Sequence, residues 1–325
     1  MGMLDTKGQA NHRMKIKFPF VAVDWGTTRM RAMLCSREQT DVDKATLIVG
    51  EGISGLSRSV PGTLFDAIEP WVRKNGQLDI VLAGMVGSNL GWRMTPYLPC
   101  PLAPGVLRDN LERFEERGHH VAIVPGVSCI NPLGQPDVMR GEEMQVLGWM
   151  TRNRSTRDSD RLLCLPGTHT KWVRISDGRL DTFTTSLTGE AYSILREHSV
   201  LVPSDEKNAP PPFDADSFAK GVVVARQHGT SLLHVLFSTR ARALFDANDI
   251  GDASSYLSGL LIGSDVQSAL RDNERSGSVV ELIGDAALCE KFRVAIELMG
   301  YGSRISDGVE MVYAGFHDLA AGGNK

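Results

Sequence analysis

Residues 18–36 read FPFVAVDWGTTRMRAMLCS: an apolar run, a turn at Gly26, and a second run with alternating apolar side chains. This pattern predicts a β-hairpin, because a glycine turn between two strand-like runs favours antiparallel pairing. Asp24 at the end of the first run can hold hydrated Mg²⁺, and Gly26, Thr27 and Thr28 can donate to phosphate oxygens. The hairpin is therefore a candidate phosphate turn, although a D-x-G-T tetrapeptide alone fits an ordinary hairpin equally well.

A second turn of the same kind lies in the other half of the chain. RLLCLPG (161–167) predicts a buried strand, and PGTHTKW (166–172) places Gly167 and Thr168 at a turn with Lys171 close behind. Two such turns on opposite sides of a cleft suit the binding of the ATP phosphates from both sides. A metal ion would then neutralise part of the phosphate charge. Neither the Walker A pattern nor a dinucleotide G-x-G-x-x-G follows a strand, which excludes those two folds.

Composition narrows the class of protein. The chain has 325 residues, a length that suggests two domains. The net charge of −4 comes without a block of like charge, so we expect no nucleic-acid and no membrane partner. The five cysteines are odd in number and form no C-x-x-C pair, which predicts neither a disulfide framework nor a zinc site and favours the cytoplasm.

The hydropathy pattern divides the chain into three parts. We expect a loose leader over 1–17, an N-terminal domain over 18–157 and a C-terminal domain over 158–325, whose final helix packs back on the N-terminal domain. The predicted helices span 63–74, 140–152, 254–270 and 287–300. The stretch 79–88 is predicted as a buried strand that runs into a glycine-rich loop, 121–128 as a short buried strand, and 279–285 as a strand that ends in a glycine turn. TFTTSLTGE (182–190) is expected to form a turn region.

Several motifs, in their order along the chain, resemble the 2-dehydro-3-deoxygalactonokinase family of the sugar kinase, actin and heat-shock ATPase superfamily. They are DWGTT (24–28), AGMVGSNLGW (83–92), MRGEEMQ (139–145), PGTHTKW (166–172) and SGLLIGSDV (258–266) with Gly284. The resemblance implies an α/β fold of two actin-like ATPase (ribonuclease H-like) domains, each with a mixed five-stranded sheet. It also implies that ATP and a sugar acid meet in the cleft between the domains.

The resemblance further implies roles for single residues. Asp24 would be the metal-associated carboxylate, with Gly26, Thr27 and Thr28 on the phosphates. Gly167 and Thr168, with Lys171, would form the second phosphate turn, and Gly284 with Asp285 would lie near the adenosine. The implied cofactors are ATP and Mg²⁺.

A kinase also needs a group that orients or deprotonates the acceptor hydroxyl. Glu142 and Glu143 open the predicted helix 140–152, a location that resembles the catalytic helix start of related sugar kinases. Acidic residues in a first helical turn are also favoured by the helix dipole alone, so a purely structural role stays open. Asp24 is the alternative base.

The carboxylate of a keto-deoxy acid calls for N–H groups, hydroxyls or a cation. The glycine-rich loop at the end of the stretch 79–88 offers such donors. The alternative interpretation of the same residues is a tight packing turn. The candidates for this pocket are Gly84, Gly87, Ser88 and Asn89, with Arg140 and Lys171 as cations. His169 lies inside the second turn, where a lone histidine is more often structural than a phosphate contact.

The resemblance implies transfer of the ATP γ-phosphoryl group to the terminal hydroxyl of 2-dehydro-3-deoxy-D-galactonate, giving the 6-phosphate in galactonate catabolism. Three alternatives remain: a kinase for another sugar or sugar acid, a phosphohydrolase of the same fold, and a non-catalytic actin-like nucleotide switch. The expected partners are the sugar acid and ATP, and a homodimer is a possible assembly.

Overall fold

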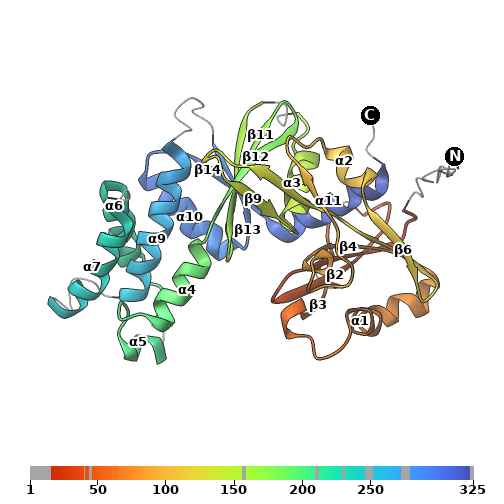
Figure 1. Ribbon diagram of the computed structural model, residues 1–325, viewed down its shortest axis with the longest axis horizontal. Coiled ribbons are helices and arrows are strands. Elements are labelled where there is room, and N and C mark those ends of the chain that lie inside the picture. Colours follow the sequence, from red (N-terminus) through yellow and green to blue (C-terminus); the bar gives the residue numbers. More distant parts are fainter. Residues whose placement is uncertain are drawn as a thin grey trace, which may run out of the picture.

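The computed structural model describes residues 16–39, 41–43, 46–155, 159–208, 212–228, 231–245, 252–271 and 279–322. Its elements form two lobes, each built on its own sheet, with two helices between them (Figure 1). The predicted leader lies outside the described residues up to position 15. Among the described helices, none combines the length and the apolar character that a membrane span requires.

The first sheet contains six strands, one more than expected. Their order is β3 (Ile48–Glu51), β2 (Arg29–Cys35), β1 (Phe20–Trp25), β4 (Asp79–Gly84), β7 (His119–Ile123) and β6 (Glu112–Glu116). β1 pairs antiparallel with β2, which confirms the predicted hairpin, and parallel with β4. The two edge strands, β3 and β6, were not predicted; the sequence of β6, ERFEE, is mostly charged and suits an exposed edge rather than a buried position.

Helix α1 (Val60–Asn75) covers one face of this sheet. Ser59 caps the start of the helix, because its hydroxyl accepts a hydrogen bond from the Gly62 amide. The first turn also contains a proline. Its buried side chains Leu64 and Ile68 pack in one cluster with residues of β1, β2, β4 and β7. The helix therefore confirms the predicted segment 63–74 and extends it toward the N-terminus.

A small third sheet directly precedes helix α3 (Glu142–Arg152) in the chain. It consists of β5 (Tyr97–Pro99), β8 (Gly126–Ile130) and β9 (Pro136–Met139). The single strand predicted over 121–128 is wrong: β7 ends at Ile123 and β8 begins at Gly126. Pro125 between them has no N–H to donate, so the chain leaves the first sheet there. Three short helices, η1 (Ile53–Gly55), η2 (Met85–Gly87) and α2 (Pro104–Asp109), complete this lobe.

The second sheet has the expected five strands. Their order is β12 (Arg179–Ser186), β11 (Thr170–Ser176), β10 (Arg161–Leu165), β13 (Val280–Gly284) and β14 (Ser303–Asp307). The predicted turn region 182–190 is wrong for its first half, which belongs to β12, because threonines are β-branched and favour strands. Both sheets place antiparallel strands on one side of the central strand and parallel strands on the other, and the first sheet adds β6 antiparallel at its edge.

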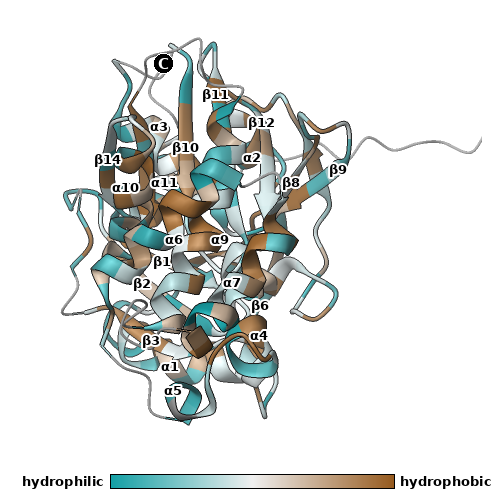
Figure 2. Cartoon of the chain, turned by 90° about the vertical axis from the view of Figure 1, so that its left-hand side faces the viewer, coloured by the Kyte–Doolittle hydropathy of each residue, from teal (hydrophilic) through white to brown (hydrophobic). Residues whose placement is uncertain are grey.

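The helices of the second lobe lie on one side of its sheet, the side that Figure 2 presents. They are α4 (Thr188–His198), α5 (Ser204–Asn208), α6 (Ala215–His228), α7 (Leu232–Phe245), α9 (Ala253–Leu270) and α10 (Ala286–Leu298). α9 and α10 confirm two predicted helices. Most residues of α9 are buried, because α6 and α7 cover it on the side away from the sheet.

Helices α3 (Glu142–Arg152) and α11 (Gly308–Ala321) lie between the two sheets (Figure 1). One hydrophobic cluster joins them to both lobes; it includes Phe20 and Ala83 from the first sheet and Leu163 and Phe183 from the second. The helices approach so closely at Gly148 that a Cβ there would lie 1.7 Å from the Met311 carbonyl oxygen. The final helix α11 also contacts β1 and β2 of the first lobe.

Candidate active site

Both predicted phosphate turns line one cavity of about 600 Å³. Residues from seven separate segments meet there. The predicted site residues in its wall are Asp24, Gly26, Thr27, Thr28, Arg140, Glu142, Gly167, Thr168 and Lys171. Met85, Tyr97, Gln145, His169 and Glu190 line the same cavity. The fold thus places carboxylates, cations and turn amides around a single space.

The first turn places a carboxylate at the end of β1. Asp24 is largely buried, and its Oδ2 lies 3.3 Å from Nη1 of Arg31. Burial raises the pKa of Asp24 to about 6; Arg31 opposes this rise and the nearby Glu142 adds to it. The Gly26 amide closes the hairpin by donating to the Arg29 carbonyl at 2.9 Å, and Thr27 is exposed beside it. The turn therefore presents an acidic group next to exposed hydroxyl and amide donors.

The second turn places a cation near the start of the strand that follows it. Lys171 is buried, and its Nζ donates to the Val138 carbonyl at 2.9 Å and to Thr185 Oγ1 at 2.8 Å. At the rim, His169 Nε2 lies 2.6 Å from a carboxylate oxygen of Glu190. The Lys171 ammonium is thus held in place by neutral acceptors, so its positive charge is not cancelled by these two partners.

The start of α3 carries two glutamates in different surroundings. Glu142 lines the cavity, and its Oε2 accepts from the Arg140 amide at 3.1 Å. Glu143 is 1% exposed and lies outside the cavity wall; one oxygen accepts from the Gly141 amide at 2.6 Å, and Oε1 is buried without a hydrogen-bond partner in the described structure. Burial raises the pKa of Glu143 to about 8, which keeps this carboxyl mostly protonated at neutral pH.

Arg140 provides a fixed guanidinium in the cavity wall. Its Nη2 donates to the Thr95 carbonyl at 2.9 Å, and its Nη1 contacts the Thr95 hydroxyl. The guanidinium carbon lies 4.3 Å from the centroid of the Tyr97 ring, a cation–π contact. A planar cation held in this way can receive a carboxylate with little loss of side-chain entropy.

Four residues predicted to bind the acceptor do not line the cavity. Of the segment after β4, only Met85 reaches its wall, whereas Gly84, Gly87, Ser88 and Asn89 do not. The Ser88 hydroxyl donates to the Met85 carbonyl at 2.7 Å. A Cβ at Gly87 would lie 2.9 Å from Nη1 of Arg140, so this glycine leaves room for the guanidinium. The segment lies behind Arg140 rather than in the wall itself.

Gly284 and Asp285, predicted to lie near the adenosine, are also outside the cavity wall. Asp285 caps α10, because its Oδ1 accepts from the amides of Ala287 at 3.0 Å and Leu288 at 3.1 Å. Gly284 lies beside the second turn: a Cβ there would be 3.5 Å from the Pro166 carbonyl oxygen. Gly284 therefore borders the second turn, Asp285 follows it as the cap of α10, and neither lines the cavity.

Tyr97, Gln145 and Glu190 belong to the cavity and were missed by the sequence analysis. Gln145 lies three residues after Glu142 in α3, so helical spacing alone could have placed both on one face. Tyr97 and Glu190 have no comparable signal, because their contacts with Arg140 and His169 join distant segments.

A sequence profile of the 2-keto-3-deoxy-galactonokinase family matches residues 24–319. A Rhizobium meliloti protein described as a probable 2-dehydro-3-deoxygalactonokinase is 32% identical over 310 residues, covering 93% of this chain and 96% of the relative. The Escherichia coli 2-dehydro-3-deoxygalactonokinase is 30% identical, with coverage of 93% and 97%. A crystal structure of a candidate 2-dehydro-3-deoxygalactonokinase from Sinorhizobium meliloti is 31% identical, covers 93% of this chain and 97% of its own, and superposes with a TM-score of 0.79. The chain therefore belongs to the 2-keto-3-deoxy-galactonokinase family.

Proposed function

We propose that this chain transfers the γ-phosphoryl group of ATP to the terminal hydroxyl of 2-dehydro-3-deoxy-D-galactonate. The product is the 6-phosphate, formed in galactonate catabolism. Membership of the family makes the chain a sugar-acid kinase. The structural observation that carries the proposal is the single cavity in which two phosphate turns from different lobes meet Glu142 and Arg140.

The ATP phosphates would lie between the two turns. Gly26, Thr27 and Thr28 would donate from one side, and Gly167 and Thr168 from the other, with the Lys171 charge close by. Gly284 borders the second turn and Asp285 follows it, which supports an adenosine site beside them. This arrangement leaves the opposite end of the cavity for the sugar acid.

The residues present fit Mg²⁺ that arrives with the nucleotide. Asp24 offers a hard carboxylate oxygen at the cavity wall, the donor that Mg²⁺ prefers. In the described part of the chain, no cluster of three or more His, Cys, Asp or Glu side chains could hold a metal ion. We therefore assign Asp24 as the protein ligand, direct or through water, and the ion would neutralise phosphate charge.

Glu142 is placed to serve the acceptor hydroxyl. Its carboxylate would orient the hydroxyl and take its proton as the oxygen attacks the γ-phosphorus. The bond between the γ-phosphorus and the bridging oxygen then breaks, and ADP leaves with that electron pair. Glu143 would act through the backbone, because its bond to the Gly141 amide fixes the residue before Glu142. Asp24 remains the alternative base.

Arg140 would bind the carboxylate of the sugar acid. The guanidinium is held by Thr95 and Tyr97 and faces the same cavity as Glu142. Charge-assisted hydrogen bonds from such a group contribute about 1.5–3 kcal/mol each. This contribution favours a sugar acid over a neutral sugar.

The finer architecture also remains a proposal. We infer that the lobes are two actin-like ATPase domains over 18–157 and 158–325, which the repeated order of hairpin and parallel strands supports. All five cysteines are free, in agreement with a reducing cytoplasm. The homodimer stays a prediction that light scattering on the full chain tests.

One assay tests the function against its alternatives. ADP release is measured with Mg·ATP and, in separate reactions, the keto-deoxy acid, a neutral ketose, other sugar acids and no acceptor. We expect release that depends on the keto-deoxy acid, with the 6-phosphate as product. Equal ADP release without an acceptor would indicate a phosphohydrolase. Faster ADP release with another acceptor would change the assigned substrate. ADP release that no acceptor stimulates would indicate a nucleotide switch.

A further inference from the structure

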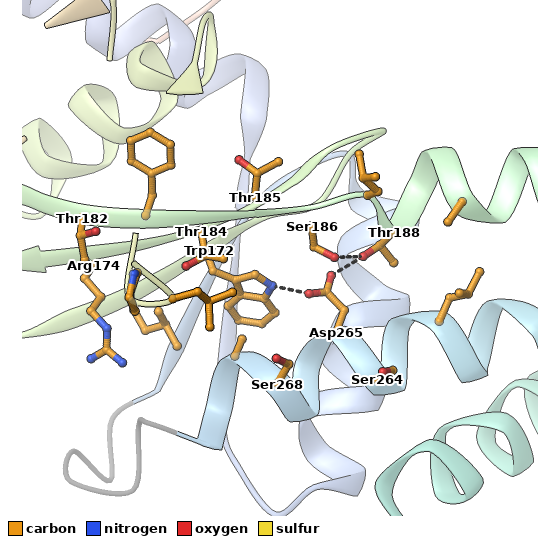
Figure 3. Close-up of a pocket in the computed structure, with 18 of the residues that line it drawn as sticks. Trp172, Arg174, Thr182, Thr184, Thr185, Ser186, Thr188, Ser264, Asp265 and Ser268 are labelled. Carbon is orange, nitrogen blue, oxygen red and sulfur yellow. Dashed lines mark hydrogen bonds between the residues drawn. The ribbon is translucent and has the colours of Figure 1, made fainter. Parts of the chain in front are cut away.

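A second cavity, of about 380 Å³, lies in the second lobe between β12, α4 and α9 (Figure 3). Its wall shares no residue with the active-site cavity. One face of β11 and β12 forms its floor through Trp172, Arg174, Thr182, Thr184 and Ser186. The volume lies at the lower end of the range for small-molecule sites. This cavity is therefore large enough for a molecule of monosaccharide size.

A buried carboxylate forms the polar centre of this cavity. Asp265 is 8% exposed, and it accepts from Trp172 Nε1 at 2.9 Å and from the Thr188 hydroxyl at 2.5 Å. The Ser186 hydroxyl lies 2.7 Å from that of Thr188 (Figure 3). Because Thr188 donates to Asp265, Ser186 donates to Thr188 and keeps its own lone pairs. A carboxylate accepts about four hydrogen bonds, so Asp265 also retains acceptor capacity.

The rest of the wall combines hydroxyls with apolar surface. Thr184, Ser264 and Ser268 add three hydroxyls that can both donate and accept. The Trp172 indole and Leu261 supply apolar area for the C–H groups of a ring. Arg174 lies at the end of the cavity away from Asp265 (Figure 3).

This chemistry selects an uncharged ligand rich in hydroxyl donors. A buried anion beside oxygen acceptors repels a carboxylate or phosphate. Hydroxyl groups of the ligand can donate to Asp265 and Ser186, and a sugar ring can pack one face on apolar side chains. We propose that this cavity binds a neutral monosaccharide or polyol, at a site separate from the kinase cavity, and that the bound ligand acts on the second phosphate turn.

The path to the phosphate turn is short. Thr188, which contacts Asp265, is the first residue of α4. The next residue, Gly189, packs so closely on the turn that a Cβ there would lie 2.4 Å from the Gly167 carbonyl oxygen. The Glu190 amide then donates to the Thr168 carbonyl at 2.9 Å. A ligand that restrains the start of α4 therefore restrains the turn that receives ATP.

Equilibrium calorimetry on the full chain tests the binding. The probes are D-galactose, D-glucose and myo-inositol, with D-galactonate as an anionic and D-glucosamine as a cationic comparison, all in the presence of saturating keto-deoxy acid. We expect saturable binding of at least one neutral probe. Ser264→Leu, which fills the cavity, should weaken it at least tenfold, and Thr184→Val about tenfold through a lost hydrogen bond. Ser193→Leu, on an exposed position of α4 outside the cavity wall, should bind as wild type.

Other results would overturn the proposal. If no neutral probe bound, or if a neutral probe bound Ser264→Leu as tightly as wild type, the proposed site would be wrong. If only D-glucosamine or only D-galactonate bound, the proposed ligand class would be wrong. The neutral probe should also lower the KM for ATP several-fold in wild type and not in Ser264→Leu; an unchanged KM would contradict the action on the turn. Because calorimetry needs no turnover, its result stands independently of the kinase assay.

Discussion

The first phosphate turn follows β1 and the second follows β10, and each connects a central strand to its antiparallel neighbour. Two residues before the turn glycine, the first has Asp24 and the second has Leu165; four residues after it, the first has Met30 and the second has Lys171. The two turns therefore share a backbone arrangement, but the first carries a carboxylate and the second carries an ammonium group. The difference teaches that the shared backbone arrangement does not fix the charge of each turn. Single side chains place a carboxylate in one lobe and an ammonium group in the other, and we propose that the carboxylate is the one that meets the metal ion.

Removing the acid of the first turn should give the largest effect. We expect Asp24→Asn to lower kcat by about 10²-fold or more, because charge that develops in the transition state loses a key stabiliser. Steady-state kinetics at saturating Mg·ATP measures this. Thermal unfolding at pH 7 is the control: the folded pKa of about 6 exceeds the unfolded value of 3.8, so ionising Asp24 costs stability as pH rises through that window. The variant should therefore unfold no earlier than wild type, and wild-type turnover would remove Asp24 from the site.

The next largest effect should distinguish the two glutamates at the start of α3. Glu142→Gln should lower kcat by roughly 10²–10⁴-fold, the contribution of a general base, with ATP binding nearly unchanged. Glu143→Gln should stay within a few-fold of wild type, because the native carboxyl is already mostly neutral at pH 7. If both variants kept full activity, the acidity of this segment would serve only the helix terminus. A loss confined to Glu143→Gln would reverse the assignment.

The charge balance at the first turn predicts a pH effect. Arg31 lowers the pKa of Asp24, so Arg31→Met should raise it further above 6. The carboxylate form is the active one, and kcat/KM therefore falls as pH drops through this pKa. We expect the acid limb of the profile to move upward by about one pH unit in the variant. Arg29→Met, on the same strand, is the control, and an unmoved limb in Arg31→Met would show that another group titrates.

Tyr97 should have the smallest effect, because it acts through Arg140. Tyr97→Leu removes a contact that contributes about 1–2 kcal/mol and should raise the KM for the sugar acid roughly 5–30-fold, with kcat little changed. Tyr97→Phe keeps the ring and should behave as wild type. An equal loss in both variants would assign the effect to the phenol hydroxyl instead.

Sequence reasoning recovered what single segments encode. The β1–β2 hairpin, α3, α9 and the two glycine turns after β1 and β10 are local patterns of apolar residues, glycine and hydroxyls, and each was predicted as a structural element. β6 was missed because its charged residues serve an exposed edge, and β12 because its threonines suit turns and strands alike. These errors come from elements whose conformation depends on their neighbours.

The candidate site was also predictable only in part, because some of its contacts depend on segments that are distant in the sequence. Asp24, Arg140, Glu142 and Lys171 line the cavity as predicted, and each lies in a motif. Ser88 and Asn89 also lie in a motif, yet their segment turns away behind Arg140. The contact between Tyr97 and Arg140 depends on the pairing of β5 with β8 and β8 with β9, which no local pattern specifies.

Helices α3 and α11 touch backbone to backbone at two glycines: a Cβ at Gly315 would lie 2.3 Å from the Met144 carbonyl oxygen, and one at Gly148 would lie 1.7 Å from the Met311 carbonyl oxygen. A larger side chain at either glycine would therefore push the two helices apart. Because both helices also pack in the cluster that joins the two lobes, and because Glu142 is the first residue of α3, such a change would shift the proposed acceptor base relative to both sheets.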